Sequence, residues 1–128
     1  MRFLHTCYRI TDIERSLAFY EALGLRELGR VPIRTEAINV FLGFPEREQE
    51  PRLELTYNLG VQRYELGSGY GHIALACEDL DATLRRLAAA GIEPERPPYS
   101  IRAGGSRLCF VRDPDGYRIE LIERRDSR

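Results

Sequence analysis

The feature of this sequence that most constrains its fold is an internal repeat at a constant spacing. Aspartates suited to begin a helix stand at Asp12 and Asp79, and glycines suited to end that helix stand at Gly24 and Gly91. The interval between the two aspartates equals the interval between the two glycines, so the start and stop signals of one helix recur in register. The pattern predicts one structural module written twice.

The first module opens with a strand-like alternation of apolar and polar residues over 4–10. Thr11 and Glu14 then match a capping box, which predicts that a helix begins here and runs to Gly24. Three short runs with strand character follow the helix, at 25–30, 37–44 and 53–58.

The second module repeats this order after a glycine-rich stretch. A strand is predicted over 72–77, either Asp79 or Asp81 can cap the next helix, and Gly91 ends it. Strand-like runs follow at 92–94, 107–112 and 117–123, and the last two are joined by the turn sequence Asp113-Pro114-Asp115-Gly116.

Each module is therefore a strand, a helix and three further strands, which places the chain in the α+β class. We expect a single domain over 1–128, with one module at about 1–59, a linker at about 60–69 and the other module at about 70–125. Neither module is large enough to bury its sheet alone, so the two should associate within the chain or between chains.

Composition excludes several classes of protein. The 19 basic and 20 acidic residues give a net charge of -1 without a basic block, so nucleic acid is a poor candidate partner. Every basic residue is an arginine, which removes Schiff-base chemistry and lysine-dependent phosphate loops. We find no membrane span, no signal peptide and only three scattered cysteines, and we therefore expect a cytoplasmic protein with reduced thiols.

Two histidines and two glutamates occupy matching places in the modules. His5 and His72 are the only histidines, and both lie in the first strand of a module, separated by the same interval as the helix signals. Glu54 and Glu120 each lie between aliphatic residues in a module's last strand. One such residue would more often be structural or solvent-facing, but four matched placements predict a shared site for a divalent transition metal.

Strand parity places further polar groups beside these candidates. His5 and Arg9 share one face of the first strand, and Glu54 and Asn58 share one face of the fourth. An arginine and an amide on the metal side could bind a carboxylate or peptide group. Alternatively, Arg9 and Asn58 simply lie at solvated strand ends.

With these residues in place, the sequence resembles glyoxalase I of the vicinal oxygen chelate superfamily over nearly its whole length. The matching motifs are Leu4-His5-Thr6 with Arg9, Ser16-x-x-Phe19-Tyr20, Leu53-Glu54-Leu55-Thr56-Tyr57-Asn58, Tyr64-Glu65-Leu66-Gly67, Gly71-His72-Ile73-Ala74, Asp113-Pro114-Asp115-Gly116-Tyr117 and Ile119-Glu120-Leu121. The resemblance implies paired βαβββ modules in a homodimer with active sites between subunits.

The resemblance also implies a function. Such enzymes are lactoylglutathione lyases of the carbon–sulfur lyase class, which detoxify methylglyoxal by isomerising its glutathione hemithioacetal to S-lactoylglutathione through an enediolate. It implies that one metal per site is held by His5, Glu54, His72 and Glu120, and that Arg9, Asn58 and Arg102 contact glutathione. The compact chain resembles the bacterial type, which favours Ni²⁺ or Co²⁺, with Zn²⁺ as the alternative.

By position in the family, Glu120 is the expected catalytic base and Glu54 acts on the opposite face of the substrate. Two other functions stay open. One is another metal-dependent enzyme of the superfamily, such as a thiol transferase or an epimerase, and the other is a non-catalytic protein that sequesters a drug.

Overall fold

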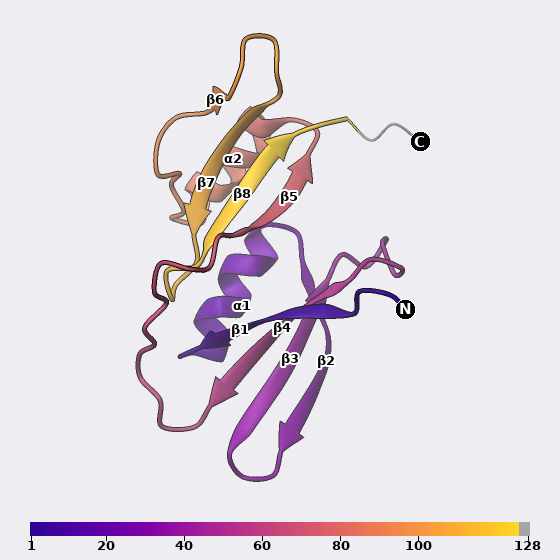
Figure 1. Ribbon diagram of the computed structural model, residues 1–128, viewed down its shortest axis with the longest axis vertical. Coiled ribbons are helices and arrows are strands. Elements are labelled where there is room, and N and C mark those ends of the chain that lie inside the picture. Colours follow the sequence, from indigo (N-terminus) through magenta and orange to yellow (C-terminus); the bar gives the residue numbers. More distant parts are fainter. Residues whose placement is uncertain (126–128) are drawn as a thin grey trace. The chain divides into compact units, whose positions relative to one another are not determined.

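The computed structural model describes residues 1–125, and these residues form two compact units (Figure 1). The first unit is Met1–Glu65, and the second begins at Leu66, inside the segment 60–69. The first contains β1 (His5–Ile10), α1 (Ile13–Ala22), β2 (Arg26–Ile33), β3 (Ala37–Gly43) and β4 (Arg52–Asn58). The second contains β5 (Ile73–Cys77), α2 (Leu80–Ala89), β6 (Tyr99–Ser100), β7 (Arg107–Arg112) and β8 (Arg118–Glu123).

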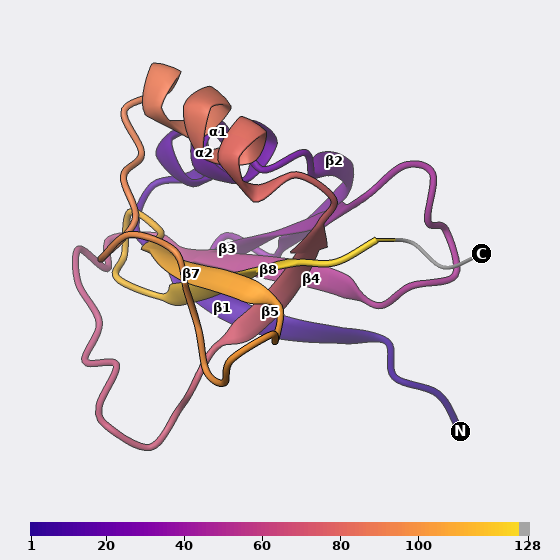
Figure 2. The same cartoon turned by 90° about the horizontal axis from the view of Figure 1, so that it is seen from above.

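The first unit is a four-stranded sheet with the strand order β1-β4-β3-β2. The strand that opens the unit pairs in parallel with the strand that ends it, and the other neighbours are antiparallel. Helix α1 covers one face of the sheet, which is evident in Figure 2. Side chains that alternate along the strands, such as Tyr8, Ile10, Leu53 and Leu55, are buried on the helix side. The opposite face keeps the polar residues of the same strands.

The second unit has the same arrangement, with the strand order β5-β8-β7-β6 and a parallel pair β5–β8. Helix α2 covers one face of this sheet too, and Leu80, Leu87, Ile119 and Leu121 are buried in the core. The two sheets share their topology, which confirms the tandem α+β modules expected from the repeat.

Helix starts confirm the repeat and correct one detail. Asp12 and Asp79, and not Thr11, are the N-cap residues, and their side chains accept hydrogen bonds from the backbone N–H groups of Arg15 and Ala82. Asp12 has the extended backbone of a cap, with φ -155° and ψ 114°, whereas the Thr11 hydroxyl accepts from the Arg15 side chain. The capping-box prediction was therefore placed one residue too early.

Helix ends follow the predicted signals. Gly24 and Gly91 have φ values of +106° and +80°, a left-handed conformation that glycine adopts without strain. The turn before β8 is also present, since the Asp113 carboxylate accepts from the backbone N–H groups of Asp115 and Tyr117.

A predicted strand at 92–94 is wrong. The structure instead forms the two-residue strand β6 at Tyr99–Ser100, which pairs with Leu108 and Arg107 of β7. Pro94, Pro97 and Pro98 have no N–H to donate to a ladder. Ile92 N–H donates back to the carbonyl of Leu87 in α2, and Glu95 N–H donates to the carbonyl of Phe110 in β7.

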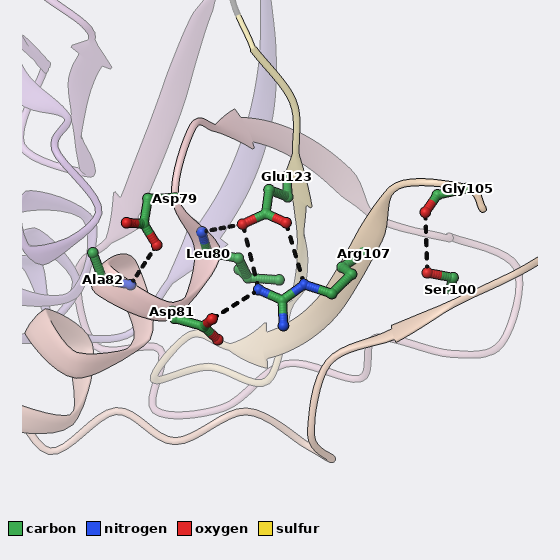
Figure 3. A network of polar contacts seen from close by, with 8 residues as sticks. All are labelled: Asp79, Leu80, Asp81, Ala82, Ser100, Gly105, Arg107 and Glu123. Carbon is green, nitrogen blue, oxygen red and sulfur yellow. Dashed lines mark hydrogen bonds and ion pairs between the residues drawn. The ribbon is translucent and has the colours of Figure 1, made fainter. Parts of the chain in front are cut away.

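A polar cluster fastens α2 to the strands of the second unit (Figure 3). The Glu123 carboxylate accepts from the backbone N–H of Leu80 at 2.8 Å and from Arg107 at 3.2 and 3.3 Å. Arg107 also pairs with Asp81 at 3.1 Å. The Arg107 hydrogen bonds and the bond from Leu80 hold the pKa of the Glu123 carboxyl below its ordinary value.

Within residues 1–125, none of the helices has the length and apolar character that a membrane crossing requires.

Candidate metal-binding pairs

In the first unit, His5 and Glu54 meet on the face of the sheet away from α1. Glu54 lies opposite Cys7 in the parallel β1–β4 register, and His5 precedes Cys7 by two residues on the same face. His5 Nε2 is 3.6 Å from Glu54 Oε1. The Glu54 side chain is only 13% exposed, so it is largely withdrawn from solvent.

The second unit brings His72 and Glu120 together in the same way. Glu120 lies opposite Ala74, and His72 stands immediately before β5, two residues ahead of Ala74. His72 Nε2 is 3.0 Å from Glu120 Oε1, and the Glu120 side chain is 15% exposed. The predicted repeat of the histidines and glutamates is therefore also a repeat of their geometry.

A row of polar groups adjoins the pair in the first unit. Cys7 Sγ is 3.3 Å from Thr56 Oγ1, and Thr56 donates to Asn39 Oδ1 at 2.9 Å. Desolvation raises the pKa of the Cys7 thiol above its ordinary value, so the thiol is protonated at neutral pH.

The three predicted substrate contacts lie at different places. Arg9 is exposed on β1, on the same face as His5, and Asn58 ends β4, where its Nδ2 donates to the Tyr64 hydroxyl at 3.0 Å. Arg102 is exposed in the segment between β6 and β7. Arg9 and Asn58 thus belong to the first unit and Arg102 to the second.

Each pair has the donor chemistry and the spacing for two neighbouring positions on one cation. Imidazole nitrogen and carboxylate oxygen suit borderline divalent metals. Two donors that each lie about 2.1 Å from a metal, at a right angle, are about 3.0 Å apart, and a wider angle brings them to about 3.6 Å. The separations of 3.0 and 3.6 Å therefore fit a shared ion.

Neither pair is a complete site by itself. Among residues 1–125, no group of three or more His, Cys, Asp or Glu side chains gathers to hold a metal. A stable transition-metal site usually needs at least three protein ligands, so the two side chains of one pair are too few.

Sequence reasoning missed an aromatic partner beside each histidine. Phe41 lies opposite Glu54 in the β3–β4 register, and Phe110 lies opposite Glu120 in the β7–β8 register. The His5 and Phe41 rings meet edge to face with centroids 5.7 Å apart, and those of His72 and Phe110 at 4.9 Å. The sequence did contain a signal for these aromatic partners, because a phenylalanine recurs in the strand before each glutamate.

The chain therefore has two βαβββ units, and each carries one histidine–glutamate pair at the same place in its sheet. A family model described as the Glyoxalase/Bleomycin resistance protein/Dioxygenase superfamily matches residues 2–121, and the chain belongs to this family.

Two curated proteins of similar sequence are lactoylglutathione lyases by name. The chain is 40% identical to the lactoylglutathione lyase of Haemophilus influenzae, over 100% of this chain and 96% of the relative. It is 42% identical to the lactoylglutathione lyase GLX1 of Arabidopsis thaliana, over 96% of this chain but only 44% of that relative. The chain thus spans less than half of the plant relative.

A solved structure is also similar to this chain in fold. The crystal structure of glyoxalase I from Zea mays superposes with a TM-score of 0.90 at 37% identity, covering 98% of this chain and 45% of that one. The fold of the two units is therefore that of glyoxalase I.

Proposed function

We propose that this chain is a metal-dependent lactoylglutathione lyase that isomerises the hemithioacetal of glutathione and methylglyoxal to S-lactoylglutathione. The observation that carries the proposal is the duplicated histidine–glutamate pair, at 3.6 Å in one unit and 3.0 Å in the other. The names of the curated relatives at about the same length as this chain support the same activity.

The proposed site combines one histidine–glutamate pair from each of two subunits. His5 and Glu54 from one subunit and His72 and Glu120 from its homodimer partner would supply four protein ligands. Six-coordinate geometry then leaves two positions for substrate or water. Isologous dimers of this kind contain two such sites, which are related by the two-fold axis.

The reaction moves one proton between adjacent carbons. The hemithioacetal carbon carries a hydroxyl, a sulfur and a weakly acidic hydrogen, and its neighbour is a carbonyl. The Glu120 carboxylate takes that hydrogen as a proton and returns it to the neighbouring carbon, while the hydroxyl proton is released and the carbonyl oxygen is protonated. The C–S bond is kept, and the product is a thioester beside a new alcohol.

Negative charge develops on the two substrate oxygens as the proton leaves. A bound divalent ion supplies Lewis-acid stabilisation of that charge, which contributes several kcal/mol. Phe110 lies opposite Glu120 in the β7–β8 register and is buried, so an apolar ring stands beside the proposed base on the same sheet.

The glutathione part of the substrate would be bound by polar groups at the edges of the site. Arg9 offers a guanidinium for a carboxylate, and Asn58, oriented by the Tyr64 hydroxyl, offers an amide for the peptide backbone. Arg102 would add a second cation from the other subunit. A cytoplasmic location, where glutathione is kept reduced, is part of the same proposal.

The test uses metal-stripped protein reloaded with one ion at a time. Formation of the thioester from methylglyoxal and glutathione is followed by ultraviolet absorbance. We expect Ni²⁺ and Co²⁺ to restore turnover and Zn²⁺ to restore little. The highest rate with Zn²⁺ would refute the metal preference, and bound metal without turnover would refute the activity.

Two variants, one at a proposed ligand and one at an exposed control position, test the proposed site. His72→Ala removes a proposed ligand and should abolish both metal binding and turnover. Glu36→Gln changes a carboxylate that is 68% exposed in the first unit and pairs with Arg34, so it should leave both unchanged.

A further inference from the structure

Arg118 lies between the Phe110 ring and the Glu95 carboxylate in the second unit, and the proposed chemistry gives it no role. It lies on β8 two residues before Glu120, so both side chains are on the same face of the strand. Its guanidinium carbon lies 3.8 Å from the centroid of the Phe110 ring. The Phe110 ring in turn meets the His72 imidazole edge to face, with centroids 4.9 Å apart and an interplanar angle of 86°.

The guanidinium is fixed from its other side by Glu95. Arg118 donates from Nε and from a terminal nitrogen to the two carboxylate oxygens of Glu95, at 2.9 and 2.8 Å. This bidentate pairing sets the plane of the guanidinium as well as its position. Arg112 also reaches Glu95, with 2.8 Å between its Nε and Oε2. The Arg118 guanidinium thus has two partners, the Glu95 carboxylate and the Phe110 ring.

The first unit has an arginine at the equivalent position but uses it differently. Arg52 precedes Glu54 by two residues, as Arg118 precedes Glu120. Its guanidinium donates to the backbone carbonyls of Arg47, Glu48 and Glu50 at 3.4, 3.1 and 2.9 Å. Arg52 therefore stabilises the loop before β4.

The partners of that arginine also differ. By register, Gly43 corresponds to Arg112, since each follows the matching phenylalanine by two residues, and Leu28 corresponds to Glu95 by the interval of the repeat. A Cβ at Gly43 would lie 2.8 Å from Leu28 Cδ1 and 3.1 Å from Arg52 Cδ, so these three positions touch but carry no carboxylate. The salt-bridged stack is therefore particular to the second unit.

The two units also differ in the distance between the histidine and the glutamate of each pair. In the unit with the stack, the imidazole and carboxylate are 3.0 Å apart, and in the other unit they are 3.6 Å apart. The rings of His5 and Phe41 are also farther apart, at 5.7 Å with an interplanar angle of 74°.

We propose that Arg118 is a positioning residue, which, clamped by Glu95, holds the Phe110 ring against His72 and so preorganises the His72–Glu120 half of the metal site. The inference rests on the proposed function only in treating this pair as metal ligands. The first unit then supplies the more adaptable pair of ligands, and the second unit supplies the rigid pair.

A cation above an aromatic ring attracts it electrostatically, and the bidentate clamp removes rotamer freedom from the arginine. When outer groups orient a ligand, their loss usually weakens metal affinity by about 10–100-fold. Arg118 acts through one intervening ring, so its loss should cost about tenfold, at the lower end of that range.

The experiment exploits the fact that the chain has only 2 histidines. The metal-free protein should give two sets of imidazole NMR signals, which His5→Gln and His72→Gln would assign. Spectra are recorded at about pH 8.5, where ordinary imidazoles are neutral, so that shifts report ring environment rather than charge.

Three variants test whether the Arg118 guanidinium, and not a neighbouring group, positions the Phe110 ring. Arg118→Met removes the guanidinium but keeps an aliphatic stem, and Arg118→Lys keeps the charge without the planar clamp. Arg112→Met is the matched control, because it breaks the other contact to Glu95 and leaves the guanidinium above Phe110.

We expect Arg118→Met to shift the His72 signals, leave the His5 signals in place and weaken Co²⁺ binding about tenfold. Arg118→Lys should behave like Arg118→Met, and Arg112→Met like the wild type. Unmoved His72 signals, or full recovery by lysine, would overturn the proposal.

The two proposals fail in distinguishable ways. If the chain binds no Co²⁺ at all, the proposed function fails, and the NMR comparison still decides whether Arg118 positions His72. If the wild type binds Co²⁺ and turns over while Arg118→Met matches it in affinity and spectrum, only the positioning role is lost.

Discussion

The proposed active site predicts that two inactive variants of this chain regain activity when they form a heterodimer. One variant, His5→Ala with Glu54→Gln, destroys the pair in the first unit, and another, His72→Ala with Glu120→Gln, destroys the pair in the second. If each active site takes one pair from each subunit, homodimers of either variant contain no intact site. A heterodimer of the two, however, joins the intact second-unit pair of one chain to the intact first-unit pair of the other.

The size of the recovery follows from the symmetry. A two-fold dimer has two sites, and in the heterodimer one site receives both intact pairs while the other receives both damaged ones. Random mixing makes half of the dimers heterodimers, so the mixture should reach roughly a quarter of wild-type activity per chain.

The assay co-expresses the two variants with different affinity tags and measures thioester formation by the metal-loaded mixture. Each variant expressed alone provides the background. Activity no greater than that background, in a preparation shown to contain heterodimers, would mean that both pairs of a site come from the same chain.

Three other predictions test single residues. Glu120→Gln should keep its metal through the amide oxygen and lose turnover by at least about 100-fold, the lower range for removal of a general base, and unchanged turnover would exclude Glu120 from the mechanism. Glu123→Gln should lower the melting temperature at neutral pH and match the wild type once the pH falls through the folded-state pKa of Glu123. That pKa is depressed by Arg107, so the pairing stabilises the fold above the ordinary carboxyl pKa and is lost in acid; an equal difference at all pH values would contradict it. Gly91→Ala meets no neighbouring atom within 4 Å, so only backbone strain at φ +80° opposes it, and chemical denaturation should show a loss of about 1–2 kcal/mol.

Local signals predicted the helices well, because each helix begins and ends through contacts within a few residues. Asp79 and Gly91 bound α2 as expected, and their counterparts bound α1. Thr11 and Asp12 are adjacent and both can cap a helix, so only the backbone conformation could choose between them.

The strand predicted over 92–94 failed for a physical reason. A three-residue run is too short for its alternation to carry information, and the following prolines prevent regular pairing. The β6 strand that forms instead depends on its partner β7, which is remote in sequence.

Part of the candidate site could be predicted because side chains alternate along strands. This parity placed His5 and Glu54 on one face, and the structure brings the two together. Parity could not predict that Arg118 turns toward Phe110 while Arg52 turns toward a loop, since that choice depends on rotamers and on Glu95.

The pairing of the unit's first strand, β1, with its last strand, β4, also determines when the His5–Glu54 pair can form during synthesis. His5 leaves the ribosome early, but its carboxylate partner Glu54 follows only on the strand that closes the unit. Contacts of such long sequence separation form late in folding, because a large loop must first be closed. In a nascent chain that lacks β4, the His5 imidazole therefore has no carboxylate beside it until the unit is complete.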